Sequence, residues 1–440
     1  MVRRLTRRSI LGAFGAGLGT LALGPQSVTA TASDERFLVD TRSTDPDLGD
    51  ARVVRDLGAI DALVIETADP SGIDVRHAPD VSLDLELPVT TQELGATPAG
   101  IDELSDLQWD KRSQRVADVH GVTDGDGTRV AVIDTGIAPD HPDLRHAVDA
   151  ERSRNFTDDD GDFTDVLGHG THVSGIIAGG DRSGRGVLGT APATDLVACR
   201  VFIGRGTARF GAILAAMVYS ARIEADAVNM SLGAYPLPLA DTDVQFLLDL
   251  LNRATAVGRQ HDTVFVAAAG NAGVDLDTDG LVVSLPTEAA NVVSVSATGP
   301  IGFRWDDDGD DGDDDPLDDL TSPPSEPAYY TNYGERAIDV SAPGGNVDRD
   351  AMDTDRRWFY DLVFSSLPSG YGWLAGTSMA APQVTAAAAL VRSRHPDLDA
   401  PGVRRHLRET ADGASAQQYH GDGHLDTHAA VTEEVEFRTD

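Results

Sequence analysis

The chain has 440 residues, of which 41% are hydrophobic, so it can build a large core and is not a disordered polymer. Its 72 acidic residues stand against 35 basic ones, a formal net charge of −37, and Lys111 is its only lysine. Such a surface suits concentrated salt, where screening reduces self-repulsion, and it excludes nucleic acid as a partner because polyanions would be repelled. The single cysteine, Cys199, excludes an intramolecular disulfide and lies in a pattern typical of a buried strand.

The N-terminus has the composition of an export signal. Residues 6–11 read Thr-Arg-Arg-Ser-Ile-Leu, an apolar Gly/Ala-rich stretch follows, and Val28-Thr29-Ala30 is a small-residue cleavage pattern. We therefore predict a twin-arginine signal peptide over residues 1–32 and a secreted protein. The apolar stretch is too short to span a bilayer, so no membrane anchor is expected.

A small α+β module is predicted over residues 33–104. Period-two patterns indicate strands at 37–39, 53–57, 60–66 and 81–86, and residues 43–50 suggest a short helix. Gly95, Pro98 and Gly100 favour a flexible boundary after the last of these strands.

Residues 105–435 alternate short, continuously apolar runs with longer helical stretches, which predicts an α/β fold with a doubly wound, mostly parallel sheet flanked by helices. In such sheets the active site lies at the carboxyl ends of the strands. The expected strands are 129–134, 196–202, 227–231, 263–268, 292–297 and 338–341, and the expected helices are 210–225, 244–258, 378–395 and 401–410. An acidic insertion is expected at 302–328, with ten aspartates between 306 and 319.

Three distant motifs each contain one reactive residue. Asp134 follows the apolar residues 130–133 in the motif 130–136, His169 lies in Gly-His-Gly-Thr-His, and Ser378 lies in Gly-Thr-Ser-Met-Ala-Ala-Pro at the start of a helix. A carboxylate that orients an imidazole, which activates a hydroxyl, is the machinery of nucleophilic catalysis. The amide at a helix N-terminus also favours a developing oxyanion.

These motifs and their flanks resemble the subtilisin-like serine proteases (subtilases, peptidase family S8), and the charge suggests the secreted, halolysin-like type. The resemblance covers residues 108–431 and implies polypeptide substrates, a self-processing monomer and an N-terminal propeptide that inhibits the enzyme. It assigns Asn271 as the side-chain oxyanion donor. It implies that residues 231–233 pair with extended substrate and that residues 268–270 form the floor of the specificity pocket, the positions being Ser231, Leu232, Gly233, Ala268, Ala269 and Gly270.

No cofactor is expected for catalysis, but calcium is possible as a structural ion. Asp275, Asp277 and Asp279 alternate before Gly280, as in calcium-binding loops, and are the candidate ligands, although the twelfth position is Pro286 and not Glu.

Two alternatives compete with the protease interpretation. A catalytically silent secreted peptide-binding protein could keep the fold, but it would not need all three reactive residues together with Asn271. An esterase-like hydrolase would need Gly-x-Ser-x-Gly and the order Ser-Asp-His, whereas the order here is Asp-His-Ser.

Overall fold

The structure is a computed structural model that describes residues 35–42, 46–85, 89–93, 103–180, 186–305, 315–354, 356–413 and 416–435. The predicted signal peptide and residues 306–314 of the acidic insertion lie outside these ranges.

The centre of the molecule is a seven-stranded sheet with the order β17-β16-β14-β12-β7-β9-β8, in which every neighbouring pair is parallel. Its middle strands are buried along almost their whole length, as expected of a sheet covered on both faces. The predicted α/β class is therefore confirmed. The strands are β7 (Arg129–Asp134), β8 (Arg154–Asn155), β9 (Asp195–Arg200), β12 (Ala227–Met230), β14 (Val264–Ala268), β16 (Val292–Thr298) and β17 (Val340–Pro343).

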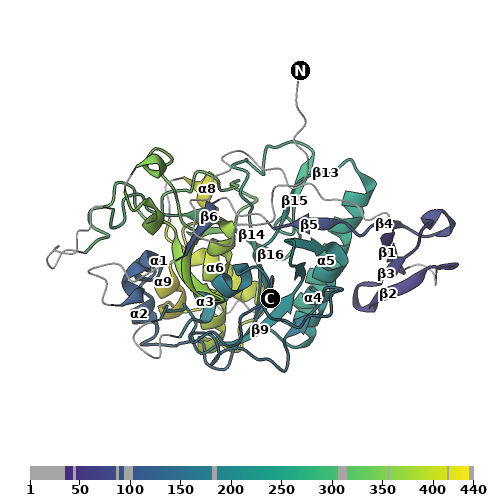
Figure 1. The fold of residues 1–440 in the computed structure, drawn as a ribbon, viewed down its shortest axis with the longest axis horizontal. Coiled ribbons are helices and arrows are strands. Elements are labelled where there is room, and N and C mark those ends of the chain that lie inside the picture. Colours follow the sequence, from purple (N-terminus) through teal and green to yellow (C-terminus); the bar gives the residue numbers. More distant parts are fainter. Residues whose placement is uncertain are drawn as a thin grey trace, which may run out of the picture.

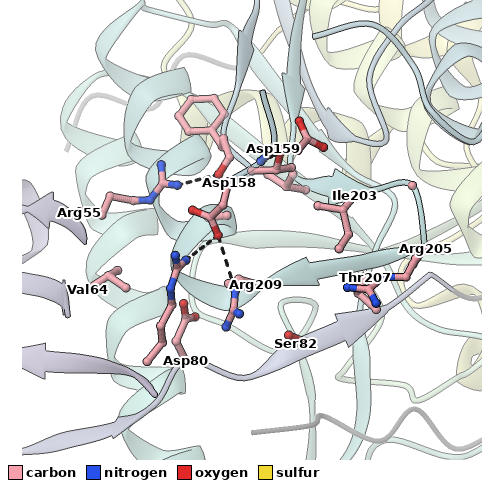
Figure 2. Close-up of a pocket in the computed structure, with 16 residues that line it drawn as sticks. Arg55, Val64, Asp80, Ser82, Asp158, Asp159, Ile203, Arg205, Thr207 and Arg209 are labelled. Carbon is pink, nitrogen blue, oxygen red and sulfur yellow. Dashed lines mark hydrogen bonds and ion pairs between the residues drawn. The ribbon is translucent and has the colours of Figure 1, made fainter. Parts of the chain in front are cut away.

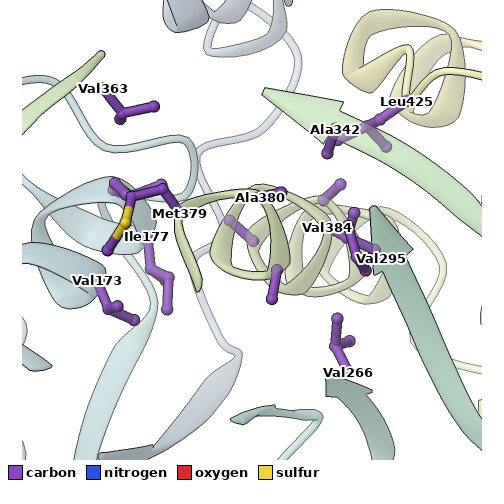
Figure 3. Close-up of a cluster of buried hydrophobic side chains, with 14 of the residues drawn as sticks. Val173, Ile177, Val266, Val295, Ala342, Val363, Met379, Ala380, Val384 and Leu425 are labelled. Carbon is purple, nitrogen blue, oxygen red and sulfur yellow. The ribbon is translucent and has the colours of Figure 1, made fainter. Parts of the chain in front are cut away.

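Helices cover both faces of this sheet (Figure 1). On one face, α3 (His169–Ala178) and α6 (Thr377–Arg394) lie at the centre of a large apolar core. Figure 3 shows Met379, Ala380 and Val384 of α6 among the strand residues of this core. The small side chains of α6 let the sheet approach closely, and α6 contacts β12, β14, β16 and β17.

The opposite face carries α4 (Phe210–Arg222) and α5 (Thr242–Gln260). Helix α5 begins where the Asp241 side chain accepts a hydrogen bond from the Asp243 N–H. The remaining helices are short or peripheral: α1 (Trp109–Ser113), α2 (Val116–Val119), α7 (Ala400–Glu409), α8 (Gln417–His420) and α9 (Thr427–Thr432).

The N-terminal module is a four-stranded antiparallel sheet with the order β2-β3-β1-β4, which lies beside α4 and α5 (Figure 1). Its strands are β1 (Arg36–Asp40), β2 (Arg52–Leu57), β3 (Ala62–Glu66) and β4 (His77–Pro79). The expected helix at 43–50 is wrong for its described part, since residues 46–50 form irregular chain and a turn. Asp47 there accepts a hydrogen bond from the Gly49 N–H, a local turn that competes with helix.

Two further strands of the N-terminal region leave this sheet and pair with the rest of the chain. Strand β5 (Ser82–Asp84) joins β10 (Phe202–Ile203) and β11 (Thr207–Arg209), and β6 (Val89–Glu93) joins the hairpin of β18 (Val363–Leu367) and β19 (Gly370–Ala375). A separate two-stranded sheet pairs β13 (Ala234–Pro238) with β15 (Val282–Leu285).

The only lysine is buried under the main core. Lys111 is 4% exposed, forms an ion pair with Asp110 at 3.2 Å, and donates hydrogen bonds to Gln383 Oε1, Thr190 Oγ1 and the Ile176 carbonyl. Gln383 in turn donates to Asp110 at 2.7 Å. This closed network ties α1 to α6 and gives Gln383 a structural role.

Replacing Lys111 with Ala should destabilise the fold by about 3–5 kcal/mol, because it leaves the Asp110 carboxylate buried without its cation. Arg112→Ala is the matched control, since Arg112 pairs with Asp315 at the surface and should cost only about 0–1 kcal/mol. Urea unfolding in concentrated salt measures both variants. Equal midpoints and slopes for the two variants would contradict a role for the buried network.

Candidate active site

The carboxyl ends of three adjacent parallel strands bring the predicted site residues to one edge of the sheet. Asp134 is the last residue of β7, Ser231 follows β12, and Asn271 comes shortly after β14. The order β14-β12-β7 in the sheet makes these strand ends neighbours, although 137 positions of sequence separate Asp134 from Asn271 (271 minus 134). Helix α6 points its N-terminus, with Ser378 as the second residue, at the same edge.

Asp134 and His169 form a buried hydrogen-bonded pair. His169 Nδ1 donates to Asp134 Oδ1 at 2.7 Å, and the side chains are 1% and 0% exposed. Burial alone would lower the pKa of His169, but the charge and hydrogen bond of Asp134 raise it above its ordinary value. A proton fixed on Nδ1 leaves Nε2 as the acceptor, and Nε2 is buried with no hydrogen-bond partner among the described residues.

A close backbone approach between two glycines sets this distance. A Cβ on Gly170 would lie 2.1 Å from the Gly136 carbonyl oxygen, and a Cβ on Gly136 would lie 2.5 Å from the Phe163 carbonyl oxygen. Gly136 also has a φ of 110°, which other residues rarely adopt. Gly136 follows Asp134 by two residues, and Gly170 follows His169 directly. Both glycines are therefore required for α3 to rest against the end of β7.

Asp165 orders the loop before His169, and the sequence analysis missed it. Its carboxylate accepts hydrogen bonds from the Leu167, Gly168 and Thr171 N–H groups and from the hydroxyls of Thr135 and Thr171. The Thr135 hydroxyl in turn accepts from the Gly170 N–H. The available signal was an acidic residue a few positions ahead of a helix start, where it can cap exposed N–H groups.

Ser378 lies on the other side of the same edge. Its Oγ donates to the Ser231 carbonyl at 3.4 Å, and the Ser231 hydroxyl donates to the Ser378 carbonyl at 2.7 Å. Ser378 is 4% exposed. Its backbone amide belongs to the first turn of α6, where N–H groups have no partner within the helix and the helix dipole favours negative charge.

Asn271 is held by its oxygen, so its amide nitrogen is the end left to donate. Oδ1 accepts from both the N–H and the hydroxyl of Thr377, at 2.9 Å each. The same Thr377 hydroxyl accepts from the Gly270 N–H at 3.1 Å. These bonds lock the turn after β14 to the turn before α6 and place a side-chain donor and the Ser378 amide around one pocket.

That pocket has a volume of about 30 Å³ and lies beside Ser378. Five of the six predicted substrate-binding residues line it, namely Ser231, Leu232, Gly233, Ala268 and Gly270. Ala269 points elsewhere and packs against Leu276 and Ile338, because adjacent residues of an extended chain face opposite sides. Asn332, which sequence reasoning missed, also lines the pocket and accepts from the Ala272 and Val274 N–H groups.

His172 is structural. Its Nε2 lies 3.2 Å from the Val363 and Gly372 carbonyls, and burial, with the nearby His169, lowers its pKa to about 3. It therefore stays neutral and joins α3 to the β18–β19 hairpin.

Two of the aspartates predicted as calcium ligands accept hydrogen bonds from backbone and hydroxyl groups. Asp277 accepts hydrogen bonds from the Arg336 and Ala337 N–H groups, and Asp275 accepts from Asp277 N–H and the Thr278 hydroxyl. Within the described residues, no group of three or more His, Cys, Asp or Glu side chains is arranged to hold a metal ion. Calcium binding at Asp275, Asp277 and Asp279 therefore stays a prediction.

The comparisons with known proteins agree with this geometry. The model of the Subtilase family matches residues 125–429. Subtilisin DY of Bacillus licheniformis is 32% identical over 308 residues, which are 70% of this chain and 92% of that protein. Subtilisin Savinase of Lederbergia lenta is also 32% identical over 308 residues, covering 70% of this chain and 91% of that protein.

Solved structures show the same likeness. A lanthipeptide protease superposes with a TM-score of 0.61 and 27% identity, covering 78% of this chain and 99% of that one. The epidermin leader peptide processing serine protease of Staphylococcus aureus, at 21% identity, gives a TM-score of 0.69 over 91% of this chain and 99% of that one, and it supports the fold alone.

Asp134→Asn should lower the pKa of His169 below its ordinary value, since burial would then act without an opposing charge. NMR titration of histidine-labelled protein measures this, with the His169→Gln spectrum used for assignment. Asp165→Asn is the comparison variant and should lower the same pKa less, because Asp165 raises it only through its charge. An unchanged His169 pKa in Asp134→Asn would contradict the paired geometry.

Proposed function

The chain belongs to the subtilase family of serine endopeptidases, and from that premise we propose a secreted, self-processing enzyme of the halolysin-like type that works in concentrated salt. The observation that carries the catalytic part is the buried Asp134–His169 pair with a free Nε2, at the sheet edge that also holds Ser378 and Asn271.

Acylation follows from these positions. His169 Nε2 takes the proton of the Ser378 hydroxyl as Oγ attacks the substrate carbonyl, and Asp134 stabilises the imidazolium that forms. The carbonyl oxygen becomes an oxyanion, which the Ser378 N–H and the Asn271 amide stabilise. The peptide bond breaks when the imidazolium gives its proton to the leaving amine.

Deacylation repeats the sequence with water. His169 removes a proton from water, the resulting oxygen attacks the ester carbonyl, and the same donors hold the second oxyanion. The proton returns to Ser378 Oγ, so the enzyme is regenerated. Activity should therefore fall as the pH is lowered through the raised pKa of His169, because only the neutral imidazole accepts a proton.

Peptide binding is proposed at residues 231–233 and in the adjoining pocket. The backbone of this segment can pair with an extended substrate, and the small pocket can accept the side chain that precedes the cut bond.

The contacts of the N-terminal module support its role as an inhibitor. It shares an apolar core with α4 and α5 through residues such as Leu38, Ile60 and Val64. Ion pairs lie around this core, including Arg253–Asp40 at 3.0 Å and Arg36–Asp158 at 2.6 Å. The module therefore docks as a folded unit on α4 and α5.

Export rests on the twin-arginine pattern of residues 6–11. No helix within the described ranges has both the length and the apolarity to cross a membrane. The salt adaptation rests on the net charge of −37.

Labelling with a fluorophosphonate tests the nucleophile. The wild type should be labelled and should hydrolyse a protein substrate such as casein, whereas Ser378→Ala should do neither. A labelled Ser378→Ala protein, or an unlabelled wild type in 3 M KCl, would refute the assignment.

Asn271→Ala should lower kcat by about 10²–10³ with little change in KM, a magnitude taken from the corresponding donor of subtilisin itself. The amide acts on the oxyanion, which exists only after the substrate has bound. Asn291→Gly is the control, because exposed Asn291 lies at the opposite end of the sheet, just before β16. A large rise in KM at constant kcat would instead indicate a binding role.

Lowering the salt from several molar KCl to 0.1 M should reduce both activity and Tm. The screening length then grows from about 3 Å or less to about 10 Å, and the surplus carboxylates repel one another. Sucrose at matched water activity is the control, because it favours compact states without screening charge. A Tm that sucrose restores as fully as KCl does would contradict the electrostatic explanation.

A further inference from the structure

We propose that a cavity at the end of the sheet opposite the active site binds a small tetrahedral dianion such as phosphate or sulfate. The cavity has a volume of about 220 Å³ and lies between the last turns of α5, the starts of β14 and β16, and helix α7. Because β14 and β16 are parallel, their starts lie together at the end of the sheet away from the catalytic groups. Occupancy of the cavity is therefore independent of catalysis and of processing.

The wall of this cavity is basic, although the chain has a large acidic excess. Of the eleven described residues that line it, four are arginines and none is acidic. The whole chain has 72 acidic residues against 35 basic ones. Arg259 comes from α5, and Arg404, Arg405 and Arg408 come from α7. Two helices thus bring positive charge to one concave place, which reverses the sign of the chain's net charge locally.

Two aspartates that do not line the cavity offset part of this charge. Asp339 accepts hydrogen bonds from Arg404 Nε and Nη2 at 3.0 and 2.8 Å, and Asp422 accepts one from Arg408 Nε at 2.5 Å. Four arginines against these two aspartates leave a surplus of two positive charges. The structure therefore supplies charge for a ligand that carries two negative charges.

Arg259 has no carboxylate partner within the described part of the chain, and it is exposed. The acidic residue nearest to it in sequence, Asp262, makes other contacts. Asp262 accepts a hydrogen bond from the Ala400 N–H at 2.7 Å and pairs with Arg392 at 2.9 Å. The guanidinium of Arg259 is thus available to an anion from solution.

The floor of the cavity is buried and contains a polar group. Thr255, Thr263, Val264 and Val293 line it, and they are between 1% and 3% exposed. The buried hydroxyl of Thr263 has no hydrogen-bond partner among the described residues. Buried polar atoms nearly always have a partner, so this hydroxyl is a donor that the protein itself leaves unused. Charge interactions above such a floor are screened less than on an open surface.

The chemistry of the wall favours a tetrahedral oxyanion. Guanidinium groups donate pairs of N–H bonds that match the oxygens of phosphate and sulfate, and these charge-assisted bonds are stronger than neutral ones. The cavity corresponds to about seven water molecules at about 30 Å³ each, which is enough for a five-atom ion and part of its water shell. A single chloride ion would leave half of the surplus charge without a partner.

A second arginine-lined cavity of the described structure shows the difference. Figure 2 shows Asp158 directed at Arg209 in a cavity of about 480 Å³. Asp158 pairs with Arg36 at 2.6 Å and with Arg209 at 3.7 Å, and Asp80 and Asp159 also line the wall. There the protein supplies its own carboxylates, so the arginines do not need an external anion.

A bound dianion would connect parts of the fold that meet at this cavity. It would be shared by arginines of α5 and α7, and α7 already contacts β14. A ligand that binds the folded state and not the unfolded chain stabilises the fold in proportion to the logarithm of its concentration. Occupancy should therefore raise the Tm.

Equilibrium dialysis with radiolabelled phosphate at pH 8 in 3 M KCl tests the site, because this salt screens attraction beyond about 3 Å. The protein is the full chain with Ser378→Ala, which prevents digestion during dialysis. It should bind one phosphate saturably, and adding Arg259→Gln should weaken the binding about tenfold or more. Arg145→Gln is the matched control, since exposed Arg145 lies outside the cavity and carries the same charge.

Unlabelled sulfate should displace the phosphate, because the two ions share shape and charge. The inference is overturned by a lack of saturable binding, by equal affinity with and without Arg259→Gln, or by a failure of sulfate to compete. Equal weakening by Arg145→Gln would also overturn it. Fluorophosphonate labelling and casein hydrolysis test the proposed function separately.

Thermal unfolding gives a second measurement. Replacing part of the KCl by potassium phosphate should raise the Tm of the Ser378→Ala chain more than that of the chain with the added Arg259→Gln. Phosphate also stabilises proteins by its exclusion from their surface, but both chains share that effect. Equal rises in Tm would contradict a bound ion at Arg259.

Discussion

The close contact between Gly136 and Gly170 is the constraint on which the active site depends. It lets α3 lie directly against the end of β7, and a single added Cβ would meet a carbonyl oxygen at 2.1 Å. Only with this approach can the Asp134–His169 bond be 2.7 Å long while both groups are buried. Burial lowers the pKa of His169, and the Asp134 carboxylate opposes this effect. Without the carboxylate, the buried imidazolium would lose its proton more readily than in water.

The basic groups of the chain that are buried are paired with aspartates. Guanidinium groups neutralise several aspartates: Asp159 pairs with the buried Arg200, and Asp158 pairs with Arg36 and Arg209. Arginine suits this role because it cannot lose its charge and binds carboxylates through several N–H groups. The one lysine is sequestered in the core with Asp110. The full chain keeps a formal net charge of −37, which is the basis of the salt dependence proposed above.

Strands and motifs were predictable because their signals are local. The run 129–134 matches β7 residue for residue, and the helices of the core were placed within a few residues of their ends. The role of Asn332 was not predictable, since it acts through backbone N–H groups that only the folded loops bring near. The pairing of strands was also not predictable. Residues 81–86 were expected in the N-terminal sheet, but β5 joins β11. An alternation of apolar and polar residues specifies a strand but not the strand with which it pairs.

The N-terminal region contacts the rest of the chain at three separate places. Its four-stranded sheet shares an apolar core and ion pairs with α4 and α5, β5 pairs with β11, and β6 pairs with β19 shortly before Ser378 in sequence. Because the three contacts belong to one covalent chain, each of them keeps the effective concentration of the other two high, so the region is held more firmly than any single contact would hold it.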